Sequence, residues 1–165
     1  MAQIDIKDAQ VFVYDGDTPQ NTLEISVGEG NLTYTENKPR EYKPNRGVLD
    51  GVRDGDQVPM AVSFDIKWEY LRGSSTSGAA PTVEDALKQR GPAAGWVSSD
   101  SDVCQPFAVD IVIIYTPSCA TGDTETITLP DFRYESLAQD LRAGTIACAG
   151  NRNATEATIV RAAQT

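Results

Sequence analysis

The chain has 165 residues, and its 24 Asp and Glu outnumber its 14 Lys and Arg, which gives a formal net charge of −10. That length suits one domain, here taken as residues 1–165, with a hydrophobic core of its own. The acidic balance argues against binding nucleic acid or anionic membranes by phosphate neutralisation, which requires clustered cations. The chain has no histidine, so imidazole catalysis and histidine zinc sites are excluded. No run of 18 apolar residues is present, so no membrane-spanning helix is expected.

The N-terminus, MAQIDIKD, has no basic stretch followed by an apolar core, so we expect no secretory signal and synthesis in the cytoplasm. The three cysteines, Cys104, Cys119 and Cys148, form no Cys-x-x-Cys pair. Without a signal for export, buried or partly buried free thiols are expected in preference to a disulfide.

The first 35 residues predict short strands. Residues 9–14 (AQVFVY) are apolar on both faces, and residues 22–27 alternate between apolar and polar side chains. The tripeptide Gly28-Glu29-Gly30 separates the second strand from a similar pattern at residues 32–35. A Gly-rich turn between two alternating stretches predicts that residues 22–27 and 32–35 pair as a hairpin.

Residues 36–57 show no convincing period and are expected to form a long loop or arm. The first half of this segment is basic. One interpretation is a solvated hairpin tip. The other is an assembly arm, because another acidic copy of the chain is the natural electrostatic partner of a basic loop. The candidate contact residues are Lys38, Arg40, Lys43 and Arg46.

The stretch from Val58 to Leu71 alternates most regularly, with apolar side chains at the even positions from Val58 to Tyr70. This pattern predicts a strand of roughly 40 Å with one apolar and one polar face. The polar residues Ser63, Asp65, Lys67 and Glu69 are expected to face either the bore or the exterior of an assembly.

One short helix is predicted at about residues 82–90, after a Gly- and Ser-rich connector. Thr82 can cap it, acidic residues occupy its first turn, and Gly91-Pro92 stops it. Its apolar stripe of Val83, Ala86 and Leu87 must pack on a sheet, because two turns are not stable alone.

The C-terminal half predicts further strands. Residues 107–115 are apolar on both faces except at Asp110, which is typical of a central strand covered on both sides. Strands are also expected at residues 125–129, 145–149 and 157–161, whereas propensity does not decide the state of residues 136–142. The fold class is therefore mainly β, an antiparallel β-sandwich or barrel with one short flanking α-helix.

No catalytic, metal or cofactor site is predicted. The Asp-Gly-Asp sequences at residues 15–17 and 54–56 lack the full ligand spacing of a calcium loop and indicate turns. Asp110 should have a perturbed pKa if it is buried. Hydrogen bonds from hydroxyls or backbone, or a position facing a pore, are the preferred interpretation. Trp68 and Trp96 could form a carbohydrate-binding platform, although Trp68 has the register of a core residue.

Four stretches between residues 47 and 161 resemble virion structural proteins of tailed bacteriophages, and most of all the tail tube (major tail) proteins. They read GVLDGVRDGDQVPMAVSFDIKWEYL, PTVEDALKQRGPAAGW, CQPFAVDIVIIYTPSC and ETITLPDFRYESLAQDLRAGTIACAG. The resemblance implies a non-enzymatic subunit that forms hexameric rings, and these rings stack into a hollow tube. DNA passes through the tube without specific binding.

The resemblance also implies assembly in the host cytoplasm and a final location in the virion tail. Further copies of the chain, the tape measure protein and the tail terminator protein are the implied partners. An acidic lumen suits this role, because it repels DNA. Two alternatives stay open: another virion component, such as a capsid decoration or tail terminator protein, and a carbohydrate-binding β-sandwich module.

Overall fold

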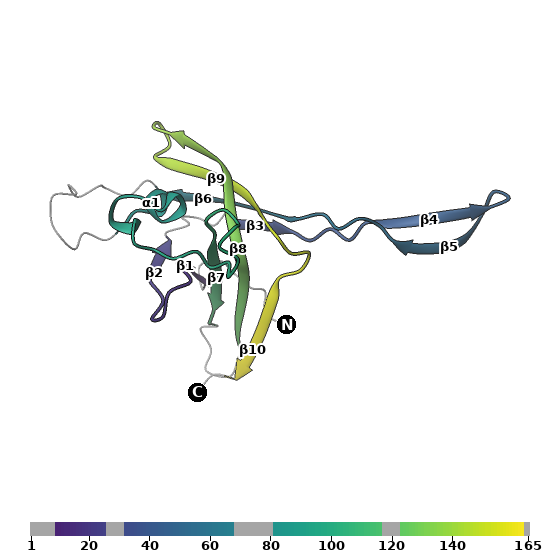
Figure 1. The fold of residues 1–165 in the computed structure, drawn as a ribbon, viewed down its shortest axis with the longest axis horizontal. Helices are drawn as coiled ribbons and strands as arrows, with labels where there is room; N and C mark the ends of the chain where they lie inside the picture. The colour runs from purple at the N-terminus through teal and green to yellow at the C-terminus, as the bar shows by residue number, and fades with distance from the viewer. Residues whose placement is uncertain (1–8, 26–31, 68–80, 117–122, 164–165) are drawn as a thin grey trace.

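The computed structural model describes residues 9–25, 32–67, 81–116 and 123–163 (Figure 1). These residues form a mainly β protein with antiparallel pairing and one short α-helix, as the sequence predicts. The elements in chain order are β1 (Ala9–Tyr14), β2 (Thr22–Ile25), β3 (Leu32–Thr35), β4 (Arg40–Asn45), β5 (Val48–Asp54), β6 (Met60–Lys67), α1 (Val83–Lys88), the 3₁₀-helix η2 (Gly91–Ala93), β7 (Val109–Tyr115), β8 (Asp123–Asp140), β9 (Thr145–Arg152) and β10 (Thr158–Ala163).

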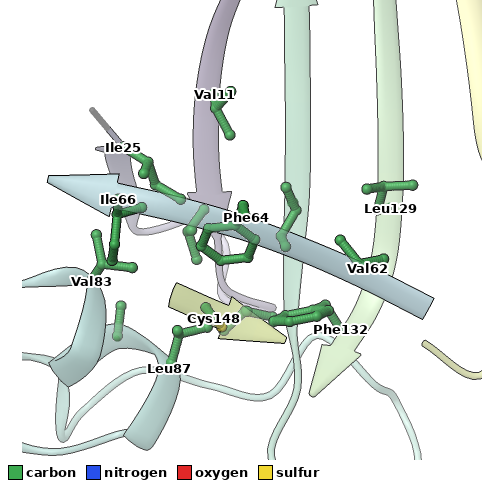
Figure 2. Close-up of a cluster of buried hydrophobic side chains, with 14 of the residues drawn as sticks. Val11, Ile25, Val62, Phe64, Ile66, Val83, Leu87, Leu129, Phe132 and Cys148 are labelled. Carbon is green, nitrogen blue, oxygen red and sulfur yellow. The ribbon is translucent and has the colours of Figure 1, made fainter. Parts of the chain in front are cut away.

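The main sheet has the strand order β2-β1-β7-β8-β9-β6-β3, and β10 pairs with β8 as well. Strand β8 belongs to two layers, because its first half pairs with β7 and β10 and its second half pairs with β9. Strand β6 of the second layer crosses over β1, β7 and β8 of the first (Figure 2). The edge strands β2 and β3 do not pair within the described residues, so the sheet folds over as a sandwich without closing into a barrel.

Strand β8 continues through Pro130, beyond the strand that the sequence predicts at residues 125–129. The pairing with β7 shifts between Val109 and Ile111, and Asp131 adopts a positive φ of 58°. A bulge of this kind bends a strand and accommodates a proline that donates no hydrogen bond. The strand extends to Asp140, so most of the undecided residues 136–142 are extended.

The predicted hairpin between residues 22–27 and 32–35 is wrong. Strands β2 and β3 lie at opposite ends of the main sheet, and β2 pairs with β1 instead. The buried carboxylate of Asp15 organises the β1–β2 connection, because it accepts hydrogen bonds from the Asn21 N–H at 2.7 Å and Asn21 Nδ2 at 2.6 Å. The first Asp-Gly-Asp sequence is thus a turn, and the backbone of Ser98 approaches it so closely that a Cβ on Gly16 would lie 2.1 Å from the Ser98 oxygen.

The core lies between the two layers, and β6 has the predicted register. Its residues alternate from buried Met60 to exposed Lys67, and Phe64 packs against Phe132 with ring centroids 5.9 Å apart (Figure 2). The strand begins at Met60 instead of Val58, and residues 68–71 lie outside the described part of the chain. Its eight described residues span about 26 Å.

The helix α1 covers one end of this core. The Thr82 side chain accepts the Asp85 N–H, and the Asp85 carboxylate accepts the Thr82 N–H, so the two form a capping box. Val83, Ala86 and Leu87 are buried against the core, as predicted. The helix ends earlier than expected, because Gln89 adopts the left-handed conformation before Gly91-Pro92 is reached. No helix in the described residues is long and apolar enough to cross a membrane.

Candidate assembly surfaces

Residues 40–54, here called the arm, form a two-stranded ribbon where the sequence predicts an irregular loop. Strands β4 and β5 pair with each other and with no other strand in the described residues, and the ribbon projects far from the body (Figure 1). At its base the Gly55 N–H donates to the Pro39 oxygen at 2.9 Å. At its tip Arg46 and Gly47 have φ values of 51° and 80°, which is a two-residue turn of type I′.

The arm has one mainly apolar face and one charged face, and the charged face also carries exposed Val48 next to the turn. Cα partners on paired antiparallel strands share a face, so Tyr42 and Val52 lie together, and Pro44 and Leu49 continue the same side. Three of these four side chains are large, apolar and more than half exposed: Tyr42 at 62%, Leu49 at 72% and Val52 at 60%. We call these four residues the apolar arm face. An ion pair between Glu41 and Arg53 lies on the opposite face.

The four predicted basic contact residues do not form one cluster. Arg40 pairs with Asp54 at the base of the apolar arm face, so its charge is neutralised within the arm. Lys43 lies on the charged face opposite Gly51, and Arg46 is in the turn. Lys38 precedes β4. Their role in subunit contacts stays a prediction, and the structure adds an apolar surface that the sequence interpretation missed.

The polar side of β6 faces away from the core. Ser63 and Lys67 are exposed and Asp65 is partly buried, whereas Glu69 lies outside the described residues. The Ser63 hydroxyl forms a 2.7 Å hydrogen bond with the Thr33 hydroxyl of the neighbouring strand β3. On the other side Ser63 lies opposite Ala149 of β9, so this surface is built of small side chains.

A second apolar surface lies on the outer side of the first layer. Strand β7 buries Val109, Ile111 and Ile113 in the core, as its inward residues should. Of its outward residues, Val112 and Ile114 are also apolar and only partly buried, whereas Asp110 is polar. The exposed Val160 of β10 lies on the same outer side. We call Phe12, Val112, Ile114 and Val160 the body patch.

Asp110 performs a structural task. Its carboxylate accepts the Asp131 N–H at 3.0 Å, and this N–H belongs to the bulge where β8 bends. Burial raises the pKa of Asp110, as expected for a partly buried acid, while the hydrogen bond from Asp131 acts in the opposite direction. The preferred interpretation, a carboxylate satisfied by backbone, is confirmed.

Arg152 lies near the same bulge and is almost fully buried. Its Nη1 donates to the backbone carbonyl oxygen of Glu156 at 2.8 Å, while its Nε has no hydrogen-bond partner among the described residues. Burial lowers the pKa of this guanidinium, and the nearby carboxylates of Asp131 and Asp110 oppose that shift. This buried group supports the bend and offers no open site.

The remaining sequence candidates give no ligand site. Trp96 is 7% exposed and part of the core, so the prediction of a carbohydrate platform is wrong for this residue, and Trp68 lies outside the described residues. Cys104 and Cys148 are free thiols, as predicted, but only Cys148 is buried; Cys104 is exposed, so the predicted burial is wrong for that residue, and Cys119 is not described. Across the described ranges no group of three His, Cys, Asp or Glu residues could hold a metal ion.

Comparisons with known proteins give a structural likeness without a sequence relationship. No protein-family model matches this chain, and no curated protein matches it in sequence. Among solved structures it is similar to a PVC sheath/tube terminator, described in the cryo-EM structure of an extracellular contractile injection system in the extended state. The TM-score is 0.56 at 11% identity, over 97% of this chain and 98% of that chain. The two chains therefore share a fold along their whole length.

Proposed function

We propose that this chain is a non-enzymatic structural subunit of a phage-like tail, and that it forms the closed ring that terminates the tail tube. The observation that carries the proposal is the arm. The arm exposes four large apolar side chains to solvent, Tyr42, Val48, Leu49 and Val52, and exposed apolar patches mark interaction sites. An arm that reaches beyond its own body is suited to contact a neighbouring subunit.

The structural likeness favours the terminator role over that of the tube subunit, which the sequence resemblance implies. The similar structure is a sheath/tube terminator, and the two folds correspond over 97% of this chain, so no large element is left over for another task. The ring, which the resemblance implies to be hexameric, would carry −10 per subunit and repel the DNA that passes through it. Its partners would be its own copies and other tail proteins.

Negative-stain microscopy and analytical ultracentrifugation of the purified chain test this proposal. We expect discrete rings of uniform bore that do not stack into long tubes. Long tubes would instead identify a tube subunit, and a monodisperse monomer at high concentration would refute both roles.

A matched variant links ring formation to the arm. Because Pro39 and Gly55 already lie within hydrogen-bond distance, residues 40–54 can be replaced by two glycines without moving the ends of the arm. This variant should keep the far-ultraviolet circular dichroism of the body strands and sediment as a monomer. Rings of unchanged size without the arm would show that another surface holds the subunits together.

A further inference from the structure

We infer that the apolar arm face of one copy packs on the body patch of the next copy, an inference that rests on the proposed ring-forming function. Each copy would then donate one arm and receive one. Such a contact is heterologous, since the two surfaces are different, and it generates a ring when the rotation between copies closes.

The donor surface is an incomplete structure. A two-stranded ribbon is marginally stable in water unless a third strand or another element covers it. Tyr42, Pro44, Leu49 and Val52 form one continuous side of this ribbon, and no described element of the same chain packs on them. The ribbon therefore presents an apolar face that a second layer would normally cover.

The acceptor surface is incomplete in the same way. Phe12 lies opposite Val112, and in the next row Ile114 and Val160 lie on either side of Thr126. The surface is therefore mixed, with apolar side chains separated by the threonines of β8. The core side of these strands is covered by β6 and α1 (Figure 2), but no described helix or strand covers the outer side. Solvent-facing sides of antiparallel sheets are normally polar, so the apolar side chains on this outer side mark it as a candidate contact surface.

Two observations identify a second copy as the cover. The arm points away from its own body, so it cannot fold back onto the patch of the same chain (Figure 1). The charges are also complementary. The arm contains four cationic and three acidic side chains, so its formal charge is +1. Because the whole chain carries −10, the residues outside the arm carry −11. An arm with a weak positive charge and an apolar face fits an acidic body with an apolar patch.

Site-specific photo-cross-linking tests the contact. A photo-reactive phenylalanine analogue at position 42 lies on the apolar arm face, and the same probe at position 43 lies on the opposite face. After irradiation of the assembled protein, mass spectrometry should find the position-42 probe joined to peptides that contain residues 112–114 or 158–163 of another copy. Cross-links from position 42 to any other surface, with rings intact, would overturn the docking inference and leave the ring proposal standing.

A pair of substitutions provides an independent readout. Val160→Glu places a charge on the patch at a side chain that is 56% exposed, so the fold should tolerate it. We expect the association constant between subunits to fall at least about tenfold, because a carboxylate would be buried against the arm. The control Val103→Glu makes the same change at a side chain that is 95% exposed and outside the patch, so this variant should assemble normally. Equal effects of both substitutions, or none from Val160→Glu, would contradict the inference, and absence of rings in the unmodified chain would refute the proposed function itself.

Discussion

Phe64 is the side chain on which the two-layer packing depends most directly. It is 1% exposed, it lies opposite Cys148 and Leu32 on the neighbouring strands, and its ring contacts Phe132 of the other layer. Replacing Phe64 with Ala should lower the free energy of unfolding by about 3–5 kcal/mol, the range for fully buried phenylalanines. Because a domain of this size has roughly 5–15 kcal/mol in total, that loss is a large fraction of the stability.

Phe64→Asp should unfold the subunit, because an unpaired buried carboxylate costs several kcal/mol beyond the lost ring. The matched substitution Lys67→Glu, three positions along and exposed, should change the stability by less than about 0.5 kcal/mol. Urea denaturation followed by circular dichroism at one fixed protein concentration measures all three variants, since association adds to apparent stability. A loss below about 1 kcal/mol for Phe64→Ala, or comparable losses for Phe64→Asp and Lys67→Glu, would show that the register of β6 is wrong.

Three further predictions concern single side chains. The raised pKa of Asp110 means that ionisation of this carboxyl opposes folding. The free energy of unfolding should therefore fall as pH rises from 3.8 through the raised pKa, and Asp110→Asn should abolish that decline. Urea titrations between about pH 4 and pH 7 measure both proteins. Burial raises the pKa of the Cys148 thiol to about 12, so in a Cys119→Ser background maleimide should label only Cys104 until the protein is unfolded; labelling of both native thiols would contradict the burial. Gly150→Ala should lower the melting temperature markedly, because its Cβ would lie 2.1 Å from the Arg133 oxygen; an unchanged melting temperature would refute that close approach.

The sequence correctly predicts the elements whose local pattern, alternation in a strand or capping in a helix, is not overridden by a contact with a distant part of the chain. Strand β6 alternates with a buried core side, so burial alone determines its register. The sequence predicts the helix because Thr82 can cap it and acidic residues occupy its first turn next to an apolar stripe. In both cases neighbours in sequence contain the necessary information.

The wrong predictions arise where a distant contact overrides the local signal. Residues 22–27 carry a good hairpin pattern, but the buried Asp15 carboxylate fixes the preceding loop and leads β2 onto β1. In the arm, Pro44 and the register shift beside it break the period of two, and Arg46-Gly47 is an uncommon sequence for a type I′ turn. Periodicity could not detect a ribbon whose apolar face depends on that shift.

The arm and the body patch bear on the choice between a tube and a terminator. A tube subunit needs two kinds of contact, one around the ring and one between stacked rings. The described residues present one unpartnered apolar donor surface and one unpartnered apolar acceptor surface. If both are used around the ring, closure buries them in every copy, and contact with the tube end would use other residues. A terminator ring needs such an axial contact on one side alone, whereas a tube subunit needs one on both sides.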